Sequence, residues 1–107
     1  MNTYFNTIEE IVQETVMYMN RFKKGHINTE LCKDEDEGVT YYIIDVAVYG
    51  YVKDTKGNPV PKCRTFEFGY TGDHKFALRK AVEVNEAMKK ITAGTDFDLK
   101  GIIELEY

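Results

Sequence analysis

The chain has 107 residues, of which 43% are hydrophobic and 30% are charged, and its formal net charge is -4. This length suits one modest core, so we predict a single domain over residues 1–107, and the composition excludes an intrinsically disordered chain. The acidic balance disfavours a nucleic-acid binder, whose lysines and arginines must neutralise phosphates, and the lack of a signal sequence or a long apolar run favours a cytoplasmic protein without membrane contact.

The first predicted element is an amphipathic helix over residues 6–24. Asn6 or Thr7 can cap its first amides while Glu9 or Glu10 reaches back, and Gly25 can take the left-handed conformation that ends it. Large apolar residues recur at helical spacing and predict one buried face. This stripe consists of Phe5, Ile8, Val12, Val16, Met19 and Phe22, with Ile11 and Tyr18 at its margin.

Two strands follow, and the second is unusually long. Residues 26–33 alternate weakly between apolar and polar side chains, and we predict an edge strand there, before the acidic turn of residues 34–37. Residues 39–52 are apolar at both alternate sets of positions around Asp45, so both faces of this strand require cover. A straight strand of this length would reach about 46 Å, and we expect it to bend at Gly50.

The second half of the chain contains a hairpin loop, a strand, a helix and a final strand. Residues 53–61 hold two prolines that cannot donate to a ladder, which predicts the loop, and residues 62–70 form the strand that follows it. Asp73 caps a helix over residues 74–93, and residues 97–107 alternate cleanly as the last strand. The apolar stripe predicted for this helix consists of Leu78, Ala81, Val82, Asn85, Met88 and Ile91.

These elements predict an α+β two-layer sandwich in the order α-β-β-β-α-β. We expect a four-stranded, mainly antiparallel sheet with both helices on one face. One helix on each face is the alternative that the pattern leaves open.

The polarity of the strands predicts which side chains the helices cover. The set of alternate residues that contains Asp45 is less suited to burial, so the other set should face the helices. The predicted covered face consists of Tyr42, Ile44, Val46, Val48, Val52, Phe66, Phe68, Tyr70, Leu99, Ile103 and Leu105. The predicted second face consists of Tyr41, Ile43, Asp45, Ala47, Tyr49 and Tyr51, beside Cys63, Thr65, Glu67, Ile102 and Glu104.

The second face is rich in tyrosine, which is common at protein interfaces because its rigid apolar ring carries a hydroxyl group that tolerates water. We interpret it as a contact surface for a protein partner, with self-association to a homo-oligomer expected. The predicted contact residues are Tyr41, Ile43, Asp45, Tyr49 and Tyr51. In a symmetric contact Asp45 needs a hydrogen-bond donor, since its burial otherwise carries a desolvation cost. The alternative is that these tyrosines are simply exposed.

The chain offers little for catalysis or for a metal cofactor. It has no serine, which excludes a Ser/His/Asp triad, and Cys32 and Cys63 belong to no Cys/His cluster, which disfavours a zinc site. The acidic turn of residues 34–37 lacks the glycine and glutamate spacing of a calcium loop, and whether it binds a cation stays open. We therefore expect a non-enzymatic protein without a cofactor or a metal ion.

A stretch in the second helix supports a competing function. The sequence HKFALRKA of residues 74–81 resembles the K-K-x-A-K run of the double-stranded-RNA-binding domain, which has a helix, three strands and a helix in the same order. Lys75 matches the first basic position and Ala77 the alanine, whereas Phe76 stands where a second lysine would be. The resemblance implies, as the alternative, a nucleic-acid surface formed by Lys75, Arg79 and Lys80.

Two further similarities concern the hairpin loop and the order of the elements. The sequence YGYVKDTKGNPVP of residues 49–61 resembles the hairpin of carboxypeptidase-regulatory-like β-sandwich domains. Those domains are all-β, so we attribute the similarity to turn chemistry. The element order is also similar to that of small bacteriophage tail-terminator-type proteins and of acidic secretion chaperones, which is an analogy of fold alone.

Overall fold

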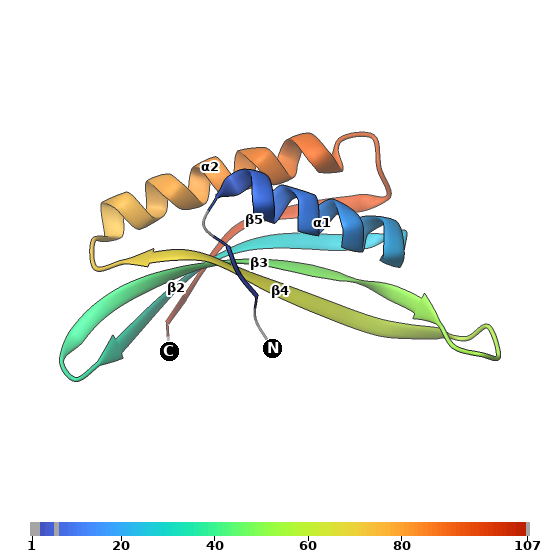
Figure 1. The fold of residues 1–107 in the computed structure, drawn as a ribbon, viewed down its shortest axis with the longest axis horizontal. Coiled ribbons are helices and arrows are strands. Elements are labelled where there is room, and N and C mark those ends of the chain that lie inside the picture. The colour runs from blue at the N-terminus through green and yellow to red at the C-terminus, as the bar shows by residue number, and fades with distance from the viewer. Residues whose placement is uncertain (1–2, 6, 107) are drawn as a thin grey trace.

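A computed structural model describes residues 3–5 and 7–106, with the side chains of residues 7–69 and 72–106. Over this range the chain forms two helices on one side of a curved five-stranded sheet (Figure 1). The elements are β1 (Thr3–Phe5), α1 (Ile8–Phe22), β2 (Gly25–Asp36), β3 (Val39–Lys53), β4 (Pro59–Thr71), α2 (His74–Thr92) and β5 (Phe97–Glu106). The order of the strands in the sheet is β1-β4-β3-β2-β5.

The predicted two-layer α+β architecture is confirmed. The four long strands form a mostly antiparallel sheet, in which β2, β3 and β4 are antiparallel neighbours and β2 and β5 form a parallel pair. Both helices pack on the same face of this sheet, α1 over β3 and β4 and α2 over β2, β3 and β5. The short β1 adds a parallel partner to β4, and its three residues carry too little pattern to be predicted.

The prediction of an edge strand over residues 26–33 is wrong. β2 lies between β3 and β5, since α2 carries the chain back over the sheet and β5 then pairs with β2 in parallel. The weak alternation comes from burial on both faces, because Leu31 lies in the core under the helices and Cys32 is buried on the opposite face.

Both helices begin at predicted caps. Thr7 Oγ1 accepts a hydrogen bond from the Glu10 amide at 3.2 Å and donates one to Glu10 Oε1 at 3.0 Å. Asp73 Oδ1 accepts hydrogen bonds from the amides of Lys75 and Phe76 at 2.8 and 3.4 Å. Local sequence chemistry therefore fixes where each helix starts.

The buried faces of the helices are rotated from the predicted stripes. In α1 the buried residues are Ile11, Thr15, Tyr18, Met19 and Phe22, and in α2 they are Ala77, Ala81, Val84, Met88 and Thr92. Val16, Leu78 and Val82, predicted to be buried, are exposed by 36%, 36% and 45%. Thr15 and Thr92 can be buried because their hydroxyl groups donate to main-chain carbonyls one turn earlier, at 2.6 and 2.9 Å. A pattern that counts only apolar residues misses such positions.

A β-bulge in β5 corrects the predicted faces of that strand. Leu99 lies opposite Ile27, but the register shifts at the next pair, so Gly101 lies opposite Asn28 and Ile102 opposite Thr29. Gly101 adopts a φ of 90° that favours glycine. The alternation is therefore reversed after Gly101. Ile102 and Glu104 lie on the helix side and Ile103 and Leu105 on the other, contrary to the prediction.

Tyr70 was predicted to lie on the covered face, but its side chain is not among those that the structure describes. Its backbone pairs with Ile43, since the β3–β4 register shifts between Ile43 and Ile44.

Candidate functional site

The face of the sheet opposite the helices, here called the open face, carries all five predicted contact residues. Their β3 positions alternate with residues that lie in the core under α1 and α2. They are Tyr41, Ile43, Asp45, Tyr49 and Tyr51. Both hairpin ends of β3 curve away from the helices, so the sheet bends toward its open side (Figure 1).

The Tyr49 ring stacks on His26 from β2. The ring centroids are 4.5 Å apart and the planes differ by 15°. Burial raises the pKa of the Tyr49 hydroxyl, and a negative charge on the neighbouring Cys63 thiol would raise it further. His26 was not among the predicted contact residues, because only the β2–β3 register places it opposite Tyr49.

The other two tyrosines lie toward the two ends of the open face. Tyr41 donates a hydrogen bond to Asp34 Oδ2 at 2.8 Å, and this bond raises the pKa of the Tyr41 hydroxyl. Tyr51, at the opposite end of β3, is 47% exposed.

Three carboxyl groups lie side by side across the centre of the open face. Glu30 on β2 pairs in register with Asp45 on β3, which pairs with Glu67 on β4, and we call these residues the acidic row. Asp45 is only 6% exposed. The Cys32 thiol donates to Asp45 Oδ2 at 3.7 Å, whereas the buried Asp45 Oδ1 has no hydrogen-bond partner among the described residues.

The electrostatics of the acidic row favour a neutral Asp45. The pKa of Asp45 is raised from 3.8 to about 6, first by burial and then by the negative charges of Glu67 and Glu30, while the Cys32 hydrogen bond opposes the shift. Burial likewise raises the pKa of Glu30. At mildly acidic pH the centre of the open face therefore carries less negative charge than its sequence implies.

Glu30, Cys32 and Asp45 bring one candidate ligand atom each to within 4.8 Å of one another, and in the part of the chain that the structure describes this is the one such group. A thiol with two carboxylates is a ligand set that zinc accepts. The hydrogen bond from Cys32 and the raised pKa of Asp45 account for the same arrangement without an ion. The acidic turn of residues 34–37 forms no comparable group.

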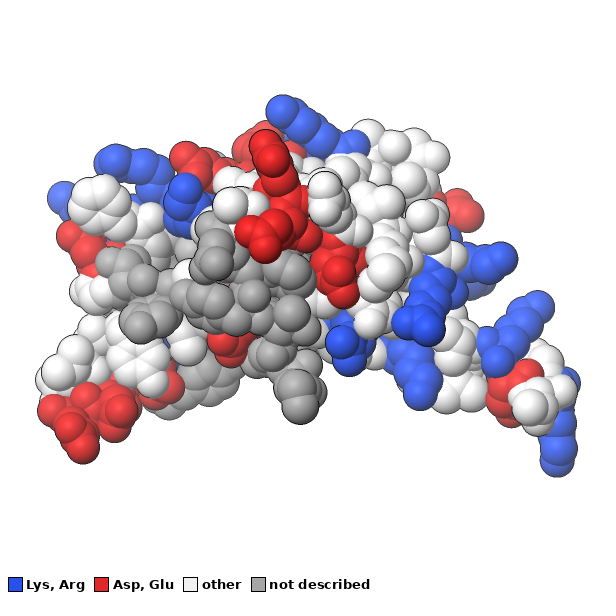
Figure 2. Space-filling model, viewed as in Figure 1, with Lys and Arg blue, Asp and Glu red and all other residues white. Residues whose placement is uncertain are grey.

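Lysines and arginines gather at one end of the molecule, and acidic side chains form the tip at the other end (Figure 2). At the basic end, a cavity of about 810 Å³ opens between the end of α1 and the β3–β4 hairpin. We call this cavity the basic pocket. Its lining residues are Arg21, Phe22, Lys23, Lys24, Tyr51, Val52, Lys53 and Pro59.

Comparison with protein-family models, with curated proteins and with solved structures finds no match to this chain. No described helix is both long enough and apolar enough to cross a membrane. The function must therefore be argued from the geometry.

The residues of the predicted nucleic-acid surface lie on the first turns of α2. Lys75, Arg79 and Lys80 are exposed there. Lys80 Nζ is paired with Glu83 Oε2 at 2.7 Å and lies 5.8 Å from the centre of the Phe68 ring, and the Arg79 guanidinium lies over Phe76. Lys80 and Arg79 are thus engaged with their own helix or sheet, and nothing in the geometry favours a phosphate contact.

The histidines and cysteines occupy separate places. His74 Nε2 lies 2.9 Å from Glu104 Oε1 on an exposed part of the surface, outside the basic pocket. Cys32 is buried and Cys63 is exposed. The expectation of a non-enzymatic protein stays a prediction.

Proposed function

We propose that this chain is a non-enzymatic protein-interaction module that self-associates through the open face of its sheet. The observation that supports the proposal best is that both helices cover the same sheet face. The Tyr49 ring and its neighbours therefore lie on a face over which the described residues place no helix.

The chemistry of the open face suits contact with a second copy. Tyrosines at both ends and partly buried apolar side chains surround the acidic row, with Leu105 of β5 37% exposed. The bulge at Gly101 turns Ile103 and Leu105 toward this face, which adds apolar area that the sequence pattern had assigned to the core. A two-fold contact would set this surface against itself, so the same apolar area would be buried on both sides of the contact.

The acidic row makes such a contact sensitive to pH. In a two-fold contact the Asp45 carboxyl groups of both copies lose water, and Glu30 and Cys32 from β2 and Glu67 from β4 face each of them. Desolvation favours the protonated form, so association should take up protons. The contact should therefore tighten as the pH falls from about 8 to about 5.

Sedimentation velocity between about 1 µM and about 1 mM protein tests the proposal, since this range covers weak and moderate dissociation constants. The wild-type chain should associate, and Tyr49→Asp should raise the dissociation constant at least about tenfold, because it buries a charge in the contact. Phe76→Asp, which adds the same charge at a 62% exposed aromatic residue of α2, is the matched control and should change little. A wild-type chain that is monomeric throughout, or equal effects of the two variants, would refute the proposal.

A further inference from the structure

The two ends of the long axis of the molecule carry opposite charge. The chain measures 50 Å along this axis, and the β2–β3 turn and the β3–β4 hairpin lie toward opposite ends of it (Figure 1, Figure 2). At 0.1 M, salt ions screen the field of a charge beyond about 10 Å. Each end therefore presents its own electric field to a neighbouring molecule. The net charge of -4 therefore conceals an acidic tip at the β2–β3 turn and a basic end at the β3–β4 hairpin, while further basic side chains lie over the start of α2 (Figure 1, Figure 2).

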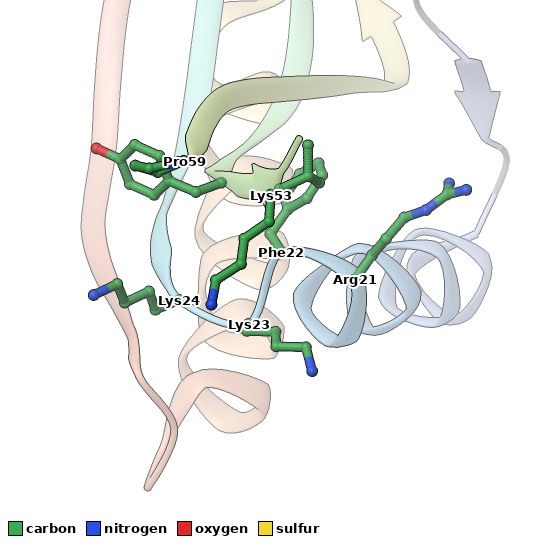
Figure 3. A pocket seen from close by; sticks show the side chains of 8 residues that line it. Arg21, Phe22, Lys23, Lys24, Lys53 and Pro59 are labelled. Atoms are coloured by element: carbon green, nitrogen blue, oxygen red, sulfur yellow. The ribbon is translucent and has the colours of Figure 1, made fainter. Parts of the chain in front are cut away.

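At the basic end, cationic side chains surround an apolar floor. Phe22, Val52 and Pro59 supply apolar lining, and Lys53 extends from β3 toward the turn that carries Lys23 and Lys24 (Figure 3). No ion pair joins these three lysines to any acidic residue that the structure describes. The basic pocket thus offers unpaired positive charge beside apolar surface, which fits a ligand that is both acidic and apolar.

At the acidic end, the β2–β3 turn combines acidic side chains with an apolar one. Glu37 and Gly38, with φ values of 50° and 78°, form a tight two-residue connection between Asp36 and Val39. Val39 is 63% exposed. Asp36 and Glu37 are exposed and have no ion pair with any described residue. The turn is therefore a narrow projection that carries unpaired carboxylates next to an exposed apolar side chain.

We propose that the basic pocket receives the acidic β2–β3 turn of a second copy of this chain. Asp36 and Glu37 would meet the pocket lysines, and Val39 would lie on the apolar floor. Because the pocket and the turn are at opposite ends of each copy, the contact is head-to-tail and can be repeated along a row of copies. This contact does not require the open-face contact, although Tyr51 borders both surfaces.

A charge-reversal exchange tests the proposal. All proteins carry Tyr49→Asp, which weakens the open-face contact, so that failure of one proposal is distinguishable from failure of the other. The chain with this single substitution is called the parent. The base-reversed variant adds Lys24→Glu and Lys53→Glu, and the acid-reversed variant adds Asp36→Lys and Glu37→Lys. The four charge-reversed residues are exposed, and far-UV circular dichroism checks that each variant folds.

Sedimentation velocity at about 0.01 M and about 1 M salt provides the readout, since the screening length is about tenfold shorter at the higher salt concentration. The parent should associate at low salt and dissociate at high salt. Each reversed variant alone should bind at least about tenfold more weakly, and an equimolar mixture should regain association, because each reversed end then meets its complement. Lys89→Glu with Lys90→Glu, exposed residues of α2 outside the pocket, changes the net charge equally and should behave as the parent.

Three outcomes would overturn the proposal. The first is a parent that does not associate at low salt. The second is a mixture that fails to regain the association lost by its two components. The third is loss in the base-reversed variant alone, which would assign the pocket to a different acidic segment.

Discussion

Asp45 shows how the open face is built at the scale of one residue. Its carboxyl group is buried between two other acidic side chains, and the described residues offer it the Cys32 thiol as a donor. A raised pKa in the folded state means that the folded chain holds a proton that the unfolded chain releases. The contribution of Asp45 to stability is therefore fully present below about pH 4 and is lost as the pH rises to about 6.

Asp45→Asn should remove this pH dependence. The amide has the shape of the protonated acid but does not ionise, so the variant should be more stable than wild type by about 1 to 3 kcal/mol at pH 8, and the difference should shrink near pH 4. Urea denaturation at both pH values, at a concentration where the chain is monomeric, measures it. The exposed Asp98→Asn is the control. A difference between Asp45→Asn and wild type that is the same at both pH values would contradict this explanation.

Gly50 allows β3 to pass beneath the end of α1. A Cβ atom at this position would lie 2.4 Å from Phe22 Cβ, a distance that forces the helix or the strand to move. Gly50→Ala should therefore lower the free energy of unfolding by about 1 to 3 kcal/mol. Gly72→Ala, whose Cβ would meet only the Thr40 carbonyl oxygen at 3.4 Å, should cost less than about 1 kcal/mol in the same urea titration. Equal losses would show that close approach to Phe22 is not the reason for the glycine.

At the scale of elements, the bulge in β5 decides which apolar residues face the helices. Ile102 packs against the core and Leu105 is 37% exposed on the open face. Ile102→Asp should therefore lower the free energy of unfolding by about 2 kcal/mol or more, and Leu105→Asp by less than about 1 kcal/mol. Leu105→Asp should instead weaken self-association. The reverse ranking by urea denaturation would mean that β5 keeps the uninterrupted alternation.

The start of α2 allows a direct test of the nucleic-acid alternative. Lys80 is paired with Glu83 and Arg79 lies over Phe76, which leaves Lys75 as the cation without an assigned contact. We expect no binding of duplex RNA that weakens with salt, as measured by fluorescence anisotropy at several salt concentrations. Binding that weakens with salt and is reduced by Lys75→Ala would support the alternative function.

Local chemistry allowed much of the fold to be predicted, whereas features set by strand register were missed. The helix caps at Thr7 and Asp73 depend on neighbouring residues alone, whereas the close approach of Gly50 to Phe22 was not predicted. The central position of β2 depends on where β5 returns, which no local pattern encodes. Gly101 inside a strand was a usable signal for the bulge, since glycine within strands often marks one.

The candidate site also contains some features that local sequence predicted and others that depend on strand register. The alternation of β3 sufficed to place its five residues on one face, because the period of a strand is two. The stacking of His26 on Tyr49 and the hydrogen bond from Cys32 to Asp45 required the β2–β3 register. The basic pocket joins the end of α1 to the end of β3, which are far apart in the sequence.

At the scale of the whole molecule, the two-layer architecture itself produces the proposed contact surface. Two helices on one side of a sheet cover one face, and β3 is apolar on both. The protein would therefore complete its structure by pairing open faces, while its charged ends would align successive copies. The two contacts should respond differently to salt, since the first buries mainly apolar area and the second joins opposite charges.

Thiol labelling of the unmodified chain tests the central claim most directly. Cys63 is exposed, lies on the open face opposite Tyr49, and would be covered when two open faces meet, whereas Cys32 is buried in either state. Pairing predicts that the labelling rate of Cys63 falls at least severalfold as the protein concentration rises from about 1 µM to about 1 mM. A Cys63 labelling rate that stays constant over this range would contradict the claim that the open face is a self-association surface.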